Sequence, residues 1–185
     1  SVLAQEYQPL EYWVVDGGST DGTLGVLREY GDRIRLMSGP DNGQSDAINR
    51  GLGRSSGEIV SWLNASDCYQ PGALASVAAY AAAHPEAGLI FGRARYMSRE
   101  GLLQGEYEVR PTEEMLALNA APDGHRKMLL SRRSGWIPQP AAFWRRSVME
   151  SAGLLDPSLH YAMDYEYWLR LGRFAPIHFL NAPLG

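Results

Sequence analysis

The sequence predicts an α/β fold with a largely parallel sheet, and three observations support this prediction. Short apolar runs alternate with segments of helical length through the first 92 residues. Only short polar links separate them, which is typical of repeated strand–helix units. Two of the apolar runs end in a polar side chain, at Asp16 and at Asn64. Since ligands of open α/β sheets bind beyond the carboxyl ends of the strands, these two residues mark the expected site.

Local patterns define the elements of the first half. The run at 11–16 combines aromatic and β-branched residues, as buried strands do. Pro71 stands in the first turn of a helical stretch, where proline is tolerated, and Gly31 ends an earlier helix. The expected order is strand 11–16, helix 21–31, strand 33–38, turn 39–43, helix 44–56, strand 58–64, helix 71–85 and strand 87–92.

The alternation changes after Gly92. The expected elements of the second half are a hairpin at 93–110 around "REG", a short helix at 112–119, helices at 145–153 and 164–174, and a strand with a following loop over 177–185. No internal repeat or low-complexity linker is present. We therefore expect one compact domain whose second half forms part of a cleft over the first.

Composition excludes several classes of protein. Of the 185 residues, 45% are hydrophobic and 21% are charged, as in ordinary globular domains. The net charge of −4, with no block of like charges, argues against a nucleic-acid partner. No apolar run approaches the roughly 18 to 20 residues of a membrane span, and no signal peptide is recognised. The single Cys68 rules out an intramolecular disulfide and favours a reducing compartment.

The stretch "DGGSTDGT" joins the first strand to a helix. It lacks the EF-hand pattern, because Gly18 and Thr20 stand where that loop needs oxygen ligands. A helix-capping role explains Asp21. Capping does not explain Asp16, which lies earlier, at the end of the strand, so we expect Asp16 to be functional.

Two further patterns favour structural roles. "GRSSG" (53–57) matches the nucleophile elbow, but it runs from helix to strand, whereas the elbow runs from strand to helix. The histidines lack metal-ligand spacing, which favours surface or packing roles for them. These histidines are His84, His125, His160 and His178. His160 stands apart, because it lies near Asp164 in the sequence.

Two carboxylates have alternatives that local sequence leaves open. Asp67 either supplies oxygen to a divalent cation or caps the helix that begins near Pro71. Asp164, followed by Glu166, stands at a helix start, where the helix dipole alone favours negative charge. A general-base role requires Asp164 to face the cleft.

Four stretches together resemble the family 2 glycosyltransferases, which have a GT-A-type nucleotide-sugar-binding fold. They are "EYWVVDGGSTDGT", "PDNGQSDAINRGLGRSSGEIVSWLNASD", "PGAL" and "WIPQPAAFWRRSVMESAGLLDPSLHYAMDYEYWLRL". Their order and spacing match over most of the chain, and the set is specific although each piece alone is weak. The resemblance is to the subgroup with "DGGSTDGT" and WLNSDD-like motifs. It implies a mostly parallel sheet flanked by helices, with a nucleotide-binding half at 1–92 and an acceptor-side half at 93–185.

The resemblance also implies roles on the nucleotide side. Asp16 would hold the base or the ribose, and Ser19 would lie near the same site. Gln44 and Asp46, in "GQSDAINRG", would shape the nucleotide side of the pocket. The two glycines that follow Asp16 would let the backbone approach the ligand closely.

On the metal and acceptor side, the segment 64–67 would be the metal motif, often written D-x-D, with Asn64 and Asp67 as ligands of Mg²⁺ or Mn²⁺. Asp164 would be the base that deprotonates the acceptor hydroxyl. The stretch "QPAAFWRR" (139–146) would line the acceptor and sugar side.

The implied reaction is inverting sugar transfer from a nucleotide-diphosphate sugar to an unidentified acceptor hydroxyl. A cation stabilises the charge that develops on the diphosphate, and a carboxylate opposite takes the acceptor proton. The implied setting is polysaccharide biosynthesis in the cytoplasm, either free or peripheral to a membrane.

Two departures from the family pattern bear on activity. Ser66 stands where the N-S-D-D pattern of the subgroup has Asp, which leaves Asp67 as the one charged residue of this motif. The first strand of the family is also lacking, and the chain reads as truncated at both ends. A strand missing inside a sheet leaves backbone groups unpaired. An exchanged segment from a second copy, giving a homodimer, and a longer native chain both stay open.

Two other functions compete with sugar transfer. Ser66 and the missing strand are compatible with a non-catalytic nucleotide-sugar-binding or assembly module. A nucleotidyltransferase is less favoured, because no glycine-rich phosphate loop followed by lysine is seen.

Overall fold

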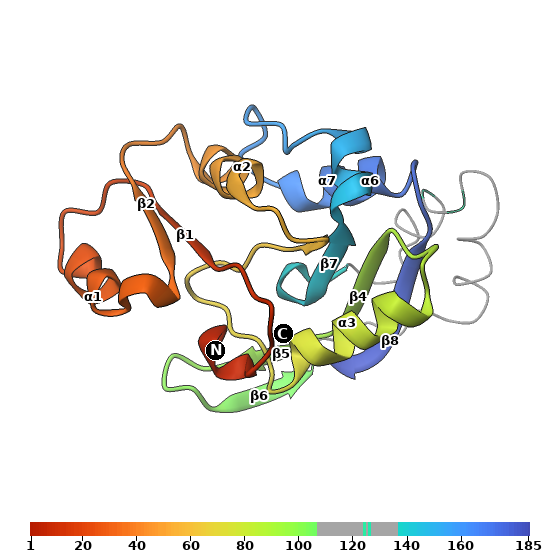
Figure 1. The fold of residues 1–185 in the computed structure, drawn as a ribbon, viewed down its shortest axis with the longest axis horizontal. Coiled ribbons are helices and arrows are strands. Elements are labelled where there is room, and N and C mark those ends of the chain that lie inside the picture. The colour runs from red at the N-terminus through yellow and green to blue at the C-terminus, as the bar shows by residue number, and fades with distance from the viewer. Residues whose placement is uncertain (107–123, 125, 127–136) are drawn as a thin grey trace.

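The structure is a computed structural model that describes residues 1–106, 124, 126 and 137–185 (Figure 1). The short helix expected at 112–119 lies outside these residues. No helix in the described part of the chain is long and apolar enough to cross a membrane. In chain order the elements are η1 (Leu3–Gln5), β1 (Trp13–Asp16), α1 (Thr23–Glu29), η2 (Gly31–Arg33), β2 (Arg35–Ser38), α2 (Gln44–Arg54), β3 (Ile59–Val60), α3 (Ala73–Ala83), β4 (Leu89–Arg93), β5 (Arg95–Met97), β6 (Leu103–Glu106), η3 (Gln139–Ala141), β7 (Ala142–Arg145), α6 (Arg146–Ala152), α7 (Met163–Leu171) and β8 (Ile177–Pro183).

The expected strands and helices of the first half are present, although β3 is shorter than predicted. β1 and β2 pair in parallel, with Trp13 opposite Arg35 and Asp16 opposite Ser38. This register brings the two carboxyl ends level, so the loops that follow both strands start side by side. In the second half, β5 and β6 form the expected hairpin.

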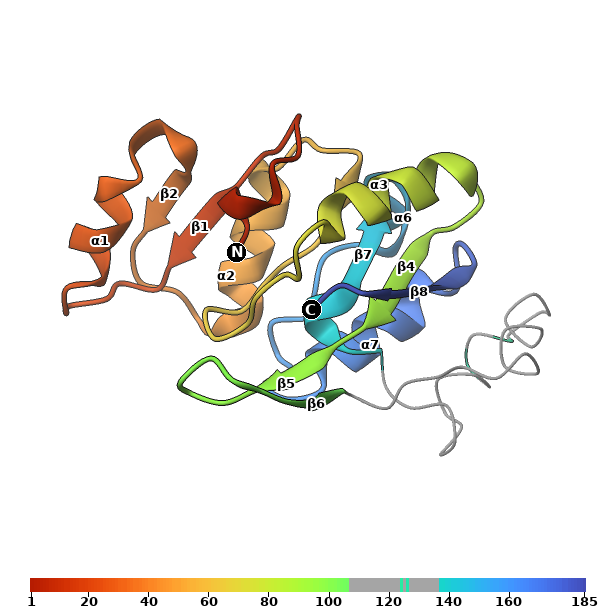
Figure 2. The same ribbon diagram turned by 90° about the horizontal axis from the view of Figure 1, so that it is seen from below.

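The main sheet agrees with the expected largely parallel arrangement in three of its four strands, and its strand β7 runs against the others. Its four strands have the order β3-β7-β4-β8. β7 runs antiparallel to both β3 and β4, whereas β8 runs parallel to β4. In Figure 2 the arrow of β7 points against those of β1 and β4. β3 and β4 therefore run the same way, and their carboxyl ends lie at one edge of the sheet.

β7 is the strand that the sequence analysis did not predict. Its residues lie within the stretch 139–146, which was expected to line the acceptor side. Instead, Phe143 and Trp144 are 3% and 0% exposed and fill the core. The run is only four residues long, with no polar alternation, so periodicity alone does not identify it as a strand.

A groove of about 740 Å³ lies between the β1–β2 pair and the main sheet. Among the described residues, β1 pairs only with β2 and β3 pairs only with β7, so each presents an open edge. Trp13 and Val15 line the groove from β1, and Ile59 lines it from β3. Figures 1 and 2 both show β1 and β7 apart. The resemblance predicts a strand inside the sheet that this sequence lacks. The groove between β1 and β3 is the place where we expect such a strand.

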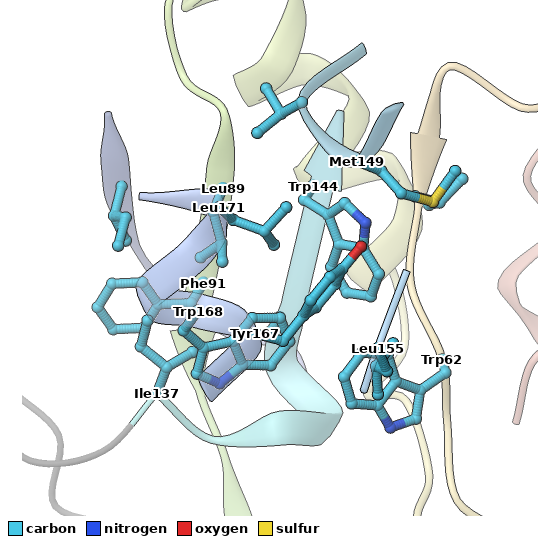
Figure 3. Packing of buried hydrophobic residues seen from close by; sticks show 14 of the residues in the cluster. Trp62, Leu89, Phe91, Ile137, Trp144, Met149, Leu155, Tyr167, Trp168 and Leu171 are labelled. Carbon is cyan, nitrogen blue, oxygen red and sulfur yellow. The ribbon is translucent and has the colours of Figure 1, made fainter. Parts of the chain in front are cut away.

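An aromatic cluster, comprising Trp62, Trp144, Tyr167 and Trp168, forms the centre of the core (Figure 3). Trp62 stacks on Trp168 with 5.3 Å between ring centroids and 15° between planes. Trp144 meets Trp62 edge to face at 5.2 Å. Aromatic pairs in such geometries contribute beyond their buried area. The cluster thereby joins the chain after β3 to β7 and α7.

We predict that Trp144→Ala lowers the free energy of unfolding by about 3–5 kcal/mol, because a fully buried ring is replaced by a cavity. Tyr161→Ala is the control, since Tyr161 is 91% exposed. This control should change stability by less than about 0.5 kcal/mol. Urea denaturation followed by circular dichroism measures both, and equal effects of the two variants would contradict the central place of Trp144.

Candidate functional site

Asp16, the last residue of β1, is 8% exposed, and the loop that follows it surrounds its carboxylate with donors. Oδ2 accepts hydrogen bonds from the backbone N–H groups of Gly18 at 3.0 Å and Ser19 at 3.1 Å. The hydroxyl of Ser38 donates to the same oxygen at 2.7 Å, and the hydroxyl of Ser19 donates to Oδ1. The carboxylate therefore holds the loops after β1 and β2 together.

These donors shift the titration of Asp16. The hydroxyls of Ser19 and Ser38, followed by the backbone N–H groups, lower its pKa from 3.8 to about 2. Hydrogen bonds to the ionised form stabilise it, and this effect exceeds the opposing effect of desolvation. Asp16 is therefore a fixed anion at neutral pH.

The two glycines after Asp16 have separate structural causes. A Cβ on Gly17 would lie 2.5 Å from Oδ2 of Asp41, so a larger residue here would displace the Asp41 side chain from its present position. Gly18 has φ +95, a conformation that L side chains rarely adopt. Asp21 accepts the backbone N–H of Thr23 at 2.9 Å in a local turn just before α1, whereas the N-cap position is Gly22 and has no side-chain cap bond, so the expected capping role is not observed.

Asp46 lies in the first turn of α2 and fixes the loop before it. Its Oδ2 accepts the backbone N–H of Asn42 at 2.9 Å and a guanidinium N–H of Arg50 at 2.8 Å. The bond from Asn42, followed by the bond to Arg50, holds the pKa of Asp46 below its ordinary value. Arg50 also donates to the carbonyl of Pro40 at 2.9 Å. Asp46 thus supports the wall of the site through the loop at 40–43.

Four polar residues, which we call the polar rim, meet beyond the carboxyl end of β3. Nε2 of Gln44 donates to Oδ1 of Asn64 at 2.7 Å. Nδ2 of Asn64 donates to Oδ2 of Asp67 at 3.1 Å and to Oε1 of Gln139 at 2.7 Å. Nε2 of Gln139 donates to the carbonyl of Trp62 at 2.8 Å, so the rim is anchored on the aromatic cluster.

The metal-ligand prediction meets a specific donor set at residues 64–67. The side chain of Asn64 is engaged in three hydrogen bonds within the rim. Asp67 carries the one carboxylate of the loop and is partly exposed, and Ser66 is exposed. Mg²⁺ is commonly held by one or two carboxylates together with substrate phosphates and water. Asp67 fits a cation that is bound chiefly through a diphosphate.

Asp164 lies in the first turn of α7, which packs beside the start of α2. Ser45, next to Gln44, donates to Sδ of Met163 at 2.8 Å. Asp164 shares a helix face with Trp168, four residues later, and Trp168 stacks on Trp62, two residues before Asn64. The core packing thus joins the helix that carries Asp164 to the chain just before the loop at 64–67.

The acceptor-side stretch 139–146 contributes less to the site than predicted. Only its first residue, Gln139, joins the polar rim. Arg145 instead donates to the carbonyls of Ala81 and Ala87, and Arg146 donates to the carbonyl of Gly57. These arginines fix the chain at the amino ends of β3 and β4, away from the rim.

Sequence reasoning missed Ser38 and Asp41 as parts of the site. Ser38 ends β2 opposite Asp16, and Asp41 lies against Gly17. A signal was available, because the parallel pairing of two consecutive strands places their last residues side by side.

We predict that Ser19→Ala raises the pKa of Asp16 from about 2 toward 3.8, because the hydroxyl of Ser19 is the largest cause of the shift. The lowered pKa means that ionised Asp16 stabilises the fold above about pH 4, and that this contribution is lost as the pH falls toward 2. The variant should therefore lose less stability over this interval than the parent. Carboxyl ¹³C NMR titration measures the pKa, and Ser76→Ala, an exposed serine on α3, is the control. An unchanged pKa would contradict the assignment.

Comparison with known proteins gives concordant results. A family model described as "Glycosyl transferase family 2" matches residues 1–150. A PGL/p-HBAD biosynthesis glycosyltransferase of Mycobacterium bovis is 35% identical over 175 residues, which are 92% of this chain and 61% of that protein. An uncharacterized glycosyltransferase of Rickettsia felis is 29% identical over 97% of this chain and 29% of its own length. The chain thus spans less than two thirds of each of these relatives.

Solved structures share the fold at lower sequence identity. Staphylococcus aureus TarS in complex with UDP-GlcNAc has a TM-score of 0.72 and 19% identity, over 99% of this chain and 51% of that one. The mannosyltransferase PcManGT from Pyrobaculum calidifontis, in complex with GDP-Man and Mn²⁺, has a TM-score of 0.65 and 20% identity, over 98% and 48%. Together with the family model, which covers most of the sequence, these findings show that the chain belongs to glycosyltransferase family 2 and has the GT-A-type fold.

Proposed function

We propose that this chain carries the donor site and the catalytic base of an inverting glycosyltransferase, which moves a sugar from a nucleotide-diphosphate donor to an acceptor hydroxyl. The observation that carries the proposal is the polar rim, which joins α2, the loop at 64–67 and η3 through side-chain hydrogen bonds. Asp164 supports the proposal because it lies in the first turn of α7, whose Trp168 stacks on Trp62 just before the loop at 64–67.

Donor binding is assigned to the two loops beside Asp16. Asp16, Ser19 and Ser38 form a rigid anionic corner, and the side chain of Asp41 from the neighbouring loop lies close to the backbone at Gly17. The fold neighbours support a nucleotide-sugar ligand, since S. aureus TarS binds UDP-GlcNAc and the P. calidifontis enzyme binds GDP-Man with Mn²⁺.

Asp67 is the residue that would hold the cation, with Ser66 as a neutral neighbour. A bound Mg²⁺ or Mn²⁺ supplies Lewis-acid stabilisation of the diphosphate leaving group. The bonds of Asn64 to Gln44, Gln139 and Asp67 fix the orientation of this carboxylate.

Asp164 is the proposed base. Its Oδ1 accepts the backbone N–H of Tyr165 at 2.8 Å, which fixes the side chain at the start of α7. A carboxylate accepts several hydrogen bonds, so an acceptor hydroxyl can donate to the same group and lose its proton as the new bond forms. Glu166 has a different role, because both of its oxygens bind the guanidinium of Arg170, at 2.6 and 2.8 Å.

A second candidate function is a non-catalytic nucleotide-sugar-binding module. Ser66 favours it, because the loop then offers a cation only one carboxylate. The two candidates differ in whether nucleotide binding depends on the metal.

We expect one nucleoside diphosphate among UDP, GDP and dTDP to raise the melting temperature of the protein only when Mn²⁺ is present. A ligand at 100 times its dissociation constant stabilises by roughly 2.7 kcal/mol, which corresponds to a shift of several degrees. Asp67→Asn should abolish the metal dependence, and Ser66→Asp should strengthen it. A shift in the parent that is indifferent to Mn²⁺ would support the non-catalytic module instead.

We predict that Asp164→Asn reduces transfer by at least about 100-fold while nucleotide affinity stays unchanged, because only proton removal is lost. Nucleoside diphosphate released from a panel of sugar nucleotides, with and without acceptor alcohols, measures transfer. The matched control is Glu166→Gln, two residues further along α7. This variant should keep transfer and lose some stability, because it loses the ion pair to Arg170. Loss of nucleotide binding in Asp164→Asn would make Asp164 a structural residue.

A further inference from the structure

A second group of metal-ligating side chains lies at the opposite end of the main sheet from the polar rim. The His–Glu cluster, comprising His84, Glu86 and His178, brings three ligand atoms within 4.8 Å of one another. His84 follows α3, and Glu86 precedes β4 by three residues. His178 is the second residue of β8, which runs parallel to β4. The cluster therefore lies at the amino ends of these strands, whereas the rim lies at the carboxyl end of β3.

The distances within the cluster suit a single ion. Oε1 of Glu86 lies 3.3 Å from Nδ1 of His84 and 3.7 Å from Nε2 of His178. Tetrahedral zinc, with ligands at roughly 2.0–2.2 Å, places neighbouring ligand atoms about 3.3–3.6 Å apart. We propose that His84, Glu86 and His178 bind one zinc-class divalent ion, with water completing the coordination on the exposed side.

A neighbouring tyrosine provides the outer support that metal-binding histidines commonly have. The hydroxyl of Tyr80 lies 3.3 Å from Nδ1 of His178. If Nδ1–H donates to this hydroxyl, the lone pair of Nε2 faces Glu86, where the ion would sit. The ring of Tyr80 also packs on the ring of His84, with 4.2 Å between centroids, which limits its rotation.

The backbone around the cluster holds the three residues in place. The backbone N–H of Gly88 donates to the carbonyl of Pro176 at 2.9 Å. A Cβ on Gly88 would lie 2.2 Å from Cβ of Ala175, so glycine allows the chain before β8 to come this close. Arg145 donates to the carbonyls of Ala81, His84 and Ala87, which fixes the turn that carries His84 and Glu86.

The donor types separate this site from the proposed donor-site cation. Two imidazoles and one carboxylate suit zinc, nickel or copper, whereas Mg²⁺ and Mn²⁺ favour oxygen ligands such as Asp67. The same contacts are also compatible with an ion pair that needs no metal, and titration with Zn²⁺ distinguishes the two.

Tag-free protein, treated with a chelator and then freed of it, is titrated with Zn²⁺ by isothermal titration calorimetry. We expect one ion per chain, and we expect Glu86→Gln and His178→Gln each to weaken binding at least tenfold. His160→Gln, a histidine outside the cluster, and Asp67→Asn, at the donor site, should bind Zn²⁺ as the parent does. Zn²⁺ should also raise the melting temperature of the parent and of these two controls only.

Two outcomes would overturn the proposal. One is the absence of Zn²⁺ binding to the parent, and the other is binding that survives both cluster substitutions. Glu86 is the safer substitution, since its side chain is 54% exposed and fills no core position. Circular dichroism of the metal-free variants shows whether each is folded, so loss of binding in a folded Glu86→Gln is decisive even if His178→Gln is unstable.

Discussion

The stacking of Trp168 on Trp62, with Trp144 against both, is the interaction on which the site depends. It joins three segments that are far apart in the sequence: the chain after β3, strand β7 and helix α7. Asn64 follows Trp62 by two residues, and Asp164 precedes Trp168 by one helical turn. This aromatic contact therefore ties to the core both the start of the proposed metal loop and the start of α7, which carries the proposed base.

The carboxylates around the site fall into two groups with different physical roles. Asp16, Asp46 and Glu166 use their oxygens on hydrogen bonds or ion pairs within the chain, and they fix loops and helix ends. Asp67 and Asp164 have fewer internal bonds and are partly exposed. This division suits a preorganised site. The first group holds the loops and helix ends in place before a ligand binds, and the second group keeps oxygens available for the ligand.

Much of this architecture could be predicted from the sequence. Periodicity and glycine or proline signals located β1, α2, α3 and the hairpin, because these elements obey local rules. β7 escaped prediction, since four buried residues without alternation carry no period. The role of Gln139, and the proximity of His84 to His178, depend on strand order in the mixed sheet, which no local pattern encodes. Local reasoning did place Asp16 at the end of a strand, and the backbone confirms that position. It also placed Asn64 at a strand end, whereas β3 ends at Val60 and Asn64 lies in the loop beyond it.

The aromatic cluster has a consequence for how the protein can be observed. Aromatic rings in fixed tertiary packing give near-ultraviolet circular dichroism, so Trp62, Trp144 and Trp168 should contribute to this signal in the folded chain. That signal exists only while the rings keep a fixed mutual orientation. The near-ultraviolet signal of the aromatic cluster therefore reports whether the core beside the polar rim is packed, and no dye or ligand has to be added.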